Sequence, residues 1–455
     1  MHKTYCILRK LRSEYLNSVR CYSKRVLPVD PSDYENLPVE DMHMKSYKDT
    51  SLYGWGLGEY GAIGHHGEVM KNMSGPDDPR LRLVIRPKRL NFGELNTVTD
   101  IAAGYGFSAF SVKKKNQCKV YGTGLNTDSQ IGFHYRKKDS YLEIVLVPLP
   151  IPLAFKWPEK TKIKNLAAGR AHLVIVTDLE GVFILGNNSY GQCGRTVIEN
   201  ENYSGSRVVH KLLQFKNDPI KSAECGQDHT LLLTESGKVY ACGWGADGQT
   251  GLGHYSIQSK PARVLGDIEN ERIVKLSSKC DCVLALNDKG EVFGWGNSEY
   301  SQLFEEGDGI QQMNRPIHLK KCTGFGKIVD VAAAGSHCMM LNEAGDVFTW
   351  GYGILGQGPN VTHNWRPKII PPVLFGRNAF QSDTVVRAIY CGLSHSAAVT
   401  NYGDVYMWGK NKERCLGLLQ KFDQFFPSRV AIGASAKKLA LGVDHSLALC
   451  HPFGS

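Results

Sequence analysis

From residue 51 onward, apolar and polar residues alternate in short runs, and glycine-rich turns separate the runs. Alternation with a period of two is typical of half-buried β-strands, whereas helices repeat every three to four residues. Residues 225–253 show the whole arrangement, with the sequence CGQDHTLLLTESGKVYACGWGADGQTGLG. This stretch joins a Gly-x-x-His corner, an apolar run that ends at a Ser-Gly turn, and an aromatic strand that leads into a glycine-rich loop. We therefore expect antiparallel strands joined by tight turns.

The same unit recurs seven times along the chain. The aromatic strand returns as LYGWG, VYGTG, VFILG, VYACG, VFGWG, VFTWG and VYMWG. The corner also occurs seven times, and its last residue is Phe107, His172, His229, Cys282, His337, His395 or His445. A single small sheet cannot bury both of its faces, but neighbouring copies packed face to face can do so. The repeat therefore predicts an all-β protein, a seven-bladed β-propeller over residues 51–455.

The two ends of the repeat region complement each other. The region starts on an aromatic strand that has no corner before it, and it finishes on a corner with no aromatic strand after it. The two half-units together make one blade. We expect the N- and C-terminal half-units to pair and close the ring, because closure removes the exposed edges of an open sheet.

The first 22 residues differ in character from the rest of the chain. They carry five basic residues against one acidic residue, with apolar side chains at helical spacing. An amphipathic, arginine-bearing leader of this kind is typical of a mitochondrial presequence, and the surroundings of Tyr22 and Ser23 predict cleavage between them. A disordered basic tail is the alternative. Residues 23–50, with three prolines and little apolar pattern, are expected to be a linker.

Composition is that of a soluble globular protein, with 42% hydrophobic residues, 22% charged residues and a net charge of +10. The thirteen cysteines contain no Cys-x-x-Cys pair, so we expect small core residues in a reducing compartment. Cys280 and Cys282 form a Cys-x-Cys pair without further ligands at suitable spacing, and no metal or other cofactor is expected. The sequence also has neither a phosphate-binding glycine loop nor a nucleophile elbow, so we expect no covalent catalysis.

The seven paired motifs resemble those of the regulator of chromosome condensation repeat family, whose members are seven-bladed propellers that promote guanine-nucleotide exchange. With the basic leader in front, the chain looks most similar to the family's mitochondrial member. The resemblance implies a non-enzymatic exchange factor in the mitochondrial matrix, with a dynamin-like GTPase of mitochondrial inner-membrane fusion as its partner. It is also compatible with peripheral association with the inner membrane; no transmembrane segment is expected, because no apolar run is long enough.

The family's GTPase contacts lie at the corners. Carried onto this chain, they give nine candidate residues: Arg170, His172, Asp228, His229, Asp281, His337, His395, Asp444 and His445. A histidine that recurs in five copies is better explained as a brace for the tight corner. The four charged residues are more informative, because the repeat does not require charge at their positions, although ordinary solvated turn residues are an equal alternative.

A second class of function comes from the basic segments. The resemblance also extends to a factor that supports maturation of mitochondrial large-subunit ribosomal RNA and ribosome assembly, with RNA and rRNA-modifying or assembly proteins as partners. The candidate RNA contacts are Lys113, Lys114, Lys115, Arg136, Lys137 and Lys138. Solubilising surface lysines are the plainer explanation. Two insertions interrupt the repeat, a long one at residues 65–86 and a moderately long one at 195–216. Because the family uses an inserted β-wedge against its GTPase, the resemblance makes residues 65–86 the candidate for such a wedge.

The cleavage prediction can be tested directly. Chain recovered from mitochondria after import should begin at Ser23, because Arg20 precedes an aromatic residue and a serine. N-terminal sequencing or intact-mass spectrometry reads this out, and a product that still begins at Met1 would contradict the prediction.

Overall fold

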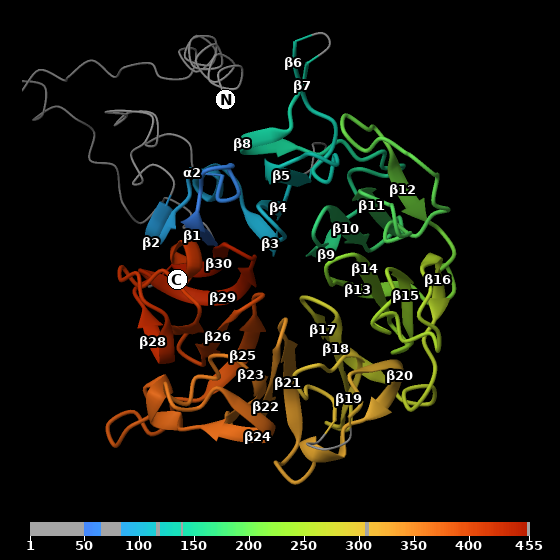
Figure 1. Ribbon diagram of the computed structural model, residues 1–455. Coiled ribbons are helices and arrows are strands. Elements are labelled where there is room, and N and C mark those ends of the chain that lie inside the picture. Colours follow the sequence, from blue (N-terminus) through green and yellow to red (C-terminus); the bar gives the residue numbers. More distant parts are fainter. Residues whose placement is uncertain (1–49, 65–82, 115–118, 138–139, 305–308, 453–455) are drawn as a thin grey trace, which may run out of the picture. The chain divides into compact units, whose positions relative to one another are not determined.

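The computed structural model describes residues 50–64, 83–114, 119–137, 140–304 and 309–452 (Figure 1). Contacts divide the chain into two units, Met1–Tyr47 and Lys48–Ser455, and the described residues belong to the second. Within them the strands form seven four-stranded antiparallel sheets and one two-stranded hairpin. The sheets follow one another around a central channel, which confirms the predicted seven-bladed propeller.

Each sheet is one blade. Blade 1 contains β3 (Val98–Ala103), β4 (Phe107–Val112), β5 (Val120–Leu125) and β8 (Ile144–Pro150), and blade 2 contains β9 (Ile163–Ala168), β10 (His172–Thr177), β11 (Val182–Gly186) and β12 (Val209–Leu212). Blade 3 contains β13 (Ile220–Cys225), β14 (His229–Thr234), β15 (Val239–Gly243) and β16 (Gln258–Arg263), and blade 4 contains β17 (Ile273–Ser278), β18 (Cys282–Asn287), β19 (Val292–Asn297) and β20 (Gln312–His318). Blade 5 contains β21 (Ile328–Ala333), β22 (His337–Asn342), β23 (Val347–Tyr352) and β24 (His363–Ile370), and blade 6 contains β25 (Val386–Cys391), β26 (His395–Thr400), β27 (Val405–Gly409) and β28 (Gln424–Val430).

Blade 7 closes the ring with strands from both ends of the repeat region. It contains β29 (Ala434–Leu441), β30 (His445–Pro452), β1 (Ser51–Leu57) and β2 (Leu83–Arg89). The junction is the antiparallel pairing of β1 with β30, which runs from Ser51 opposite Cys450 to Gly56 opposite His445. The predicted pairing of the two half-units is therefore confirmed.

Helical structure is confined to short connections. The described residues contain one helix, α2 (Asn91–Leu95), and three 3₁₀ turns, η4 (Lys320–Cys322), η5 (Pro372–Phe375) and η6 (Lys412–Arg414). None of the described helices is long and apolar enough to cross a membrane. The folding unit is thus held together by strands and by side chains between blades.

The first strand of each blade lines the channel, and neighbouring first strands contact one another around the ring. Two aspartates connect them: Asp100 accepts the backbone N–H of Leu166 in the next blade at 2.8 Å, and Asp330 likewise accepts the N–H of Ile389 at 3.1 Å. A lysine of the preceding blade pairs with each, Lys438 with Asp100 and Lys275 with Asp330. These carboxylates therefore connect three consecutive blades each.

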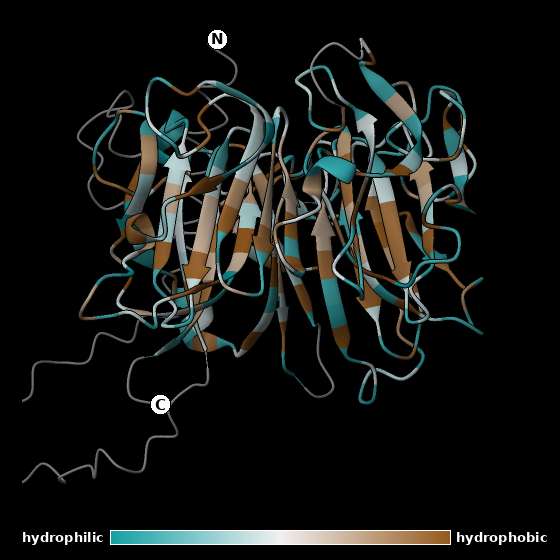
Figure 2. Cartoon of the chain, turned by 90° about the horizontal axis from the view of Figure 1, so that it is seen from below, coloured by the Kyte–Doolittle hydropathy of each residue, from teal (hydrophilic) through white to brown (hydrophobic). Residues whose placement is uncertain are grey.

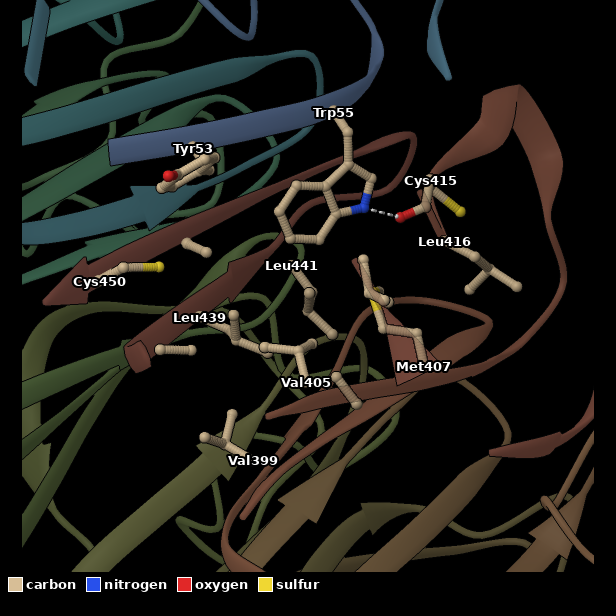
Figure 3. Close-up of a cluster of buried hydrophobic side chains, with 14 of the residues drawn as sticks. Tyr53, Trp55, Val399, Val405, Met407, Cys415, Leu416, Leu439, Leu441 and Cys450 are labelled. Atoms are coloured by element: carbon tan, nitrogen blue, oxygen red, sulfur yellow. Dashed lines mark hydrogen bonds between the residues drawn. The ribbon is translucent and has the colours of Figure 1, made fainter. Parts of the chain in front are cut away.

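Tryptophans of the aromatic strand connect blades farther from the axis. The Trp55 indole N–H donates to the Cys415 carbonyl at 2.7 Å, so β1 is fastened to the glycine-rich loop of blade 6 (Figure 3). Trp295 and Trp350 make the same contact with the loop of the preceding blade, at 3.0 and 2.7 Å. The four tryptophans of this position (Trp55, Trp295, Trp350 and Trp408) are fully buried, so each ring fills the space between two blades.

The antiparallel blades leave loops at the two ends of their strands, as the side view shows (Figure 2). The corners between first and second strands lie at the same end as the glycine-rich loops between third and fourth strands. The second-to-third-strand turns and the connections between blades lie at the other end. We call these ends the corner face and the opposite face. This is the arrangement expected from the order of the motifs.

The long segment 133–162 contains regular structure that is not part of the repeat. It contains the hairpin of β6 (Tyr135–Lys137) and β7 (Ser140–Tyr141) and then the outer strand β8. The hairpin base packs against insertion 195–216, where the Arg207 guanidinium lies 4.3 Å from the centre of the Phe133 ring. Such an inserted hairpin breaks the repeat and leaves no periodic signal in the sequence.

Closure of the ring leads to a prediction about truncation. Deleting residues 436–455 removes β30 and most of β29, so β1 loses its partner strand and blade 7 its inner half. We expect the deletion variant to lose cooperative thermal unfolding and to aggregate. Circular dichroism melting and size-exclusion chromatography measure this, and a soluble, cooperatively melting truncation would contradict the closure.

Candidate functional site

The Gly-x-x-His corner is built by packing a ring beneath the glycine. A Cβ atom added at Gly169 or Gly226 would lie 2.2 or 2.0 Å from Cε1 of the histidine that ends the same corner. It would also press on the next blade, because the Cys280 carbonyl oxygen would lie 2.4 Å from a Cβ at Gly226. Only glycine leaves room for both contacts. The first residue of the corner motif is therefore determined by packing.

Corner histidines form hydrogen bonds to hydroxyl groups of the next blade. His172 Nε2 lies 3.0 Å from the Thr230 hydroxyl, and His337 Nε2 lies 2.7 Å from the Ser396 hydroxyl. His445 of blade 7 reaches Ser108 of blade 1 at 2.9 Å. His229 makes a longer contact with Ser278, at 3.3 Å. The five corner histidines are at most 2% exposed, so these candidate residues lie beneath the surface that a partner would contact.

Burial also fixes the charge state of these rings. It lowers the pKa of His172 and His337 to about 4, and that of His229 and His395 to about 3. The imidazoles are therefore neutral at physiological pH. A neutral ring can take up the tautomer that its hydroxyl neighbour requires, and it adds no charge to the corner face.

Two charged candidates form an ion pair with each other. The Arg170 guanidinium approaches both Asp228 carboxylate oxygens, with Nη2–Oδ2 at 2.7 Å and Nε–Oδ1 at 3.1 Å. The Arg170 side chain is 49% exposed and that of Asp228 only 11%. Burial raises the pKa of Asp228, and the neighbouring guanidinium opposes the increase. The pair spans the corners of blades 2 and 3, with arginine as its outer member.

Asp281 of blade 4 is hydrogen-bonded but has no cationic partner among the ion pairs of the described residues. Its carboxylate accepts the Gln249 side-chain N–H at 2.9 Å and lies 3.3 Å from the Cys280 sulfur. Burial raises its pKa. The Cys280 thiol in turn lies 2.9 Å from the Gln227 amide nitrogen of blade 3, and burial raises its pKa to about 12. The thiol is thus protonated and takes part in a polar network rather than acting as a nucleophile.

Asp444 lies apart from this group, at the corner of blade 7. Its carboxylate oxygen is 3.0 Å from Nδ1 of His445. Burial by itself would raise the pKa of Asp444, but the hydrogen bond and charge of His445 outweigh it and lower the pKa. The candidates of blades 2, 3 and 4 therefore form a contiguous polar group, to which Asp444 does not belong.

Sequence reasoning missed two further residues of this group. Tyr105 stands in the blade 1 corner at the place that Arg170 holds in blade 2, and its buried hydroxyl has no hydrogen-bond partner among the described residues. Burial raises its pKa, and the negative charges of Asp281 and Asp228 contribute. Lys279 replaces the corner glycine of blade 4. Both belong to corners that depart from the repeat, and that departure was the available signal.

The RNA candidates lie on other parts of the chain. Lys113 is exposed on the opposite face, as expected from its position between β4 and β5, and Lys114 Nζ lies 3.2 Å from the Tyr121 hydroxyl. Arg136 and Lys137 belong to β6. Lys115 and Lys138 lie outside the described residues, as do Tyr22, Ser23 and residues 65–82 of the first insertion. In the part of the chain that the structure describes, no group of three potential metal ligands occurs.

Comparisons with known proteins agree with the repeat pattern. Models of the regulator of chromosome condensation (RCC1) repeat match residues 49–111, 181–233, 236–286, 289–341 and 402–449, with further matches at 220–249 and 386–415. The chain belongs to the RCC1 repeat family. It is 45% identical to the mouse RCC1-like G exchanging factor-like protein over 412 residues, covering 88% of this chain and 87% of the relative. The human protein of the same name is also 45% identical, over 410 residues with the same coverage.

Solved structures show the same architecture. The crystal structure of human WBSCR16 is 45% identical, with a TM-score of 0.83 over 89% of this chain and 99% of that one. Yeast RCC1 (Prp20), in a structure bound to Kap60, shares the fold at 19% identity, with a TM-score of 0.72 over 90% of each chain. The family assignment expected from the motifs is thus confirmed, and this chain is a propeller similar to exchange factors.

Neutral buried histidines make a prediction about acid stability. Their folded-state pKa values lie below the ordinary value of about 6.5, so the unfolded chain binds more protons as the pH falls. The stabilisation is complete above about pH 6.5 and is lost progressively as the pH falls toward 4. We expect the melting temperature to fall between pH 7.5 and 5.0, and to fall less in His337→Gln, which has one fewer buried imidazole. Equal melting temperatures of the unmodified protein at the two pH values would contradict this explanation.

Proposed function

We propose that this protein is a guanine-nucleotide exchange factor for a dynamin-like GTPase of mitochondrial fusion, and that it acts in the mitochondrial matrix. The exchange class is supported by the relatives named RCC1-like G exchanging factor-like protein. The compartment is supported by the basic, amphipathic first 22 residues. An exchange factor needs no covalent chemistry, because it works by binding the nucleotide-free GTPase more tightly than the nucleotide-bound form.

One observation carries the assignment of the binding face. Three of the four charged corner residues that the repeat does not require, Arg170, Asp228 and Asp281, lie at the consecutive blades 2, 3 and 4 and are connected by an ion pair and hydrogen bonds. Arg170 exposes half of its side chain, which makes its guanidinium available to a partner. Arginine is enriched at the points that dominate binding energy in protein interfaces. The polar group thus offers a charged, partly preorganised contact surface.

The polar group also explains how a partner could be distinguished. Asp281 is a partly buried carboxylate that forms no ion pair with another described residue, so a basic side chain of the GTPase placed there would relieve the cost of desolvating its charge. Asp228 already has Arg170, so contacts near it would involve the exposed arginine. The two neighbouring corners therefore present charges of opposite sign to a partner, the Arg170 guanidinium at one and the Asp281 carboxylate at the other. This arrangement favours one binding orientation of the partner over others.

The alternative function is association with mitochondrial large-subunit ribosomal RNA as an assembly factor. One observation supports this alternative. Lys113 is exposed on the opposite face, away from the corner group. A lysine there can contact phosphates without occupying the exchange surface. The two functions could therefore use different faces of the same propeller.

Charge reversal at the corners tests the proposal. The double variant Asp228→Lys and Asp281→Lys should reduce nucleotide exchange at least tenfold, because it removes the only negative side of the group and leaves Arg170 facing a second cation. The assay follows release of fluorescent GDP from the dynamin-like GTPase. RNA association, measured by filter binding to large-subunit rRNA fragments, should remain.

Two controls separate the faces. Asp288→Lys makes the same charge change at an exposed position of the opposite face and should leave exchange unchanged. Neutralising Lys113, Lys114 and Lys115 together with Arg136, Lys137 and Lys138 should weaken RNA association and spare exchange. If all folded variants keep both activities, the assignment of functions to faces is wrong.

A further inference from the structure

We propose that Lys279 is a positioning residue: it straps the irregular corner of blade 4 to the irregular corner of blade 1 across the channel, and so holds Asp281 for the partner. This inference rests on the exchange function proposed above. The geometry that carries it is one contact, in which Lys279 Nζ donates to the Ala103 carbonyl at 2.9 Å. Ala103 ends β3, directly before the corner that contains Tyr105. Blades 1 and 4 are three places apart around the ring of seven, so the side chain crosses the channel mouth.

Blade 4 needs such a strap because it lacks the usual brace. In the five corners that end in histidine, the imidazole ring packs beneath a glycine or reaches a hydroxyl of the next blade. Blade 4 has Cys282 in place of the histidine, and its sulfur lies 3.9 Å from that of Cys338 in blade 5, a weak contact. The corner glycine is absent as well, and Lys279 takes its place. The same substitution that removes the local brace thus supplies a side chain long enough to reach another blade.

The charge of Lys279 is balanced inside the channel. Burial lowers the pKa of Lys279, and the attraction of Glu224 in blade 3 opposes the decrease. Burial likewise raises the pKa of Glu224, and Lys279 is the strongest of the charges that oppose the increase. The ammonium group therefore has a carbonyl acceptor on one side of the channel and a carboxylate within electrostatic reach on another.

The two residues that follow Lys279 belong to the proposed GTPase-binding surface. Cys280 and Asp281 follow Lys279 directly, and Tyr105 of blade 1 is close enough to both for their charges to affect its pKa. On the outer side the loop is held by Gln249, which donates to Asp281, and by the Asn297 N–H, which donates to the Asp281 carbonyl at 2.8 Å. Lys279 fixes the channel side of the same loop. Without it, the partly buried carboxylate would be anchored at one end only.

Lysine-to-methionine substitution tests the strap, because methionine keeps an aliphatic chain and removes the donor. In full-length Lys279→Met, hydrogen–deuterium exchange should become faster in peptides covering residues 279–282 and also in peptides covering 103–106 of the distant blade. KM for the GTPase should rise about tenfold while kcat changes little, since ordering a few loop residues must then occur on binding. Lys279→Arg, which keeps the donor and the charge, should restore both readouts. Should the methionine variant fail to fold, Lys279→Leu, which also lacks a donor, replaces it.

Lys275→Met is the matched control. It removes a channel lysine of the same blade, whose partner is Asp330 of blade 5, and should leave peptides 103–106 and KM unchanged. If Lys279→Met speeds hydrogen exchange only in 279–282, or in neither segment, then Lys279 does not hold the corners of blades 1 and 4 together. A loosened strap with unchanged KM would overturn the positioning role, while the exchange function would stand if Asp228→Lys with Asp281→Lys still abolished activity. If that double variant also left exchange intact, the proposed function itself would fail.

Discussion

Imidazoles buried at the seams between blades join one blade of the propeller to the next. Four of the five rings fill the space under the glycine of their own corner, the exception being His337 of blade 5. Three rings bond a hydroxyl of the following blade at 2.7 to 3.0 Å. The aromatic strands bond to the preceding blade instead. The indole N–H groups of Trp55, Trp295 and Trp350 donate to backbone carbonyls of that blade. The histidine bonds join blades 2 and 3, 5 and 6, and 7 and 1. The tryptophan bonds join blades 3 and 4, 4 and 5, and 6 and 7, so the two kinds of contact hold different seams of the ring. A ring made of such contacts offers a rigid platform.

Departures from this scheme gather in one sector. The corners of blades 1 and 4 lack the histidine, and between them the corners of blades 2 and 3 carry Arg170 and Asp228. The corresponding corners of blades 5 and 6 contain only small or apolar side chains, Gly335 and Leu393. A repeat that needs no charge at these places carries it at the neighbouring corners of blades 2, 3 and 4, and separately at Asp444 of blade 7. We therefore assign the binding role to corner positions whose residue type is not determined by packing between blades.

Most of the architecture could be predicted from the sequence because it is periodic. The glycine and histidine positions recur in most blades and the aromatic strand in all seven, and the half-units at the ends give the closure. Individual contacts across the ring could not be predicted. Arg170 and Asp228 were both recognised as candidates, but their pairing depends on two corners meeting in space. Lys279 and Tyr105 were passed over for the same reason, since the carbonyl that Lys279 binds is 176 residues away in the chain. The β6–β7 hairpin has no counterpart in other blades and therefore no periodic signal.

We propose that the corner face at blades 2 to 4 receives the GTPase. Hydrogen–deuterium exchange of the full chain, with and without the nucleotide-free dynamin-like GTPase, tests this placement. We expect slower exchange in the corner segments 169–172, 226–229 and 279–282 when the GTPase is bound, with no change at 112–114 on the opposite face. Protection of 112–114 without protection of the three corners would contradict it.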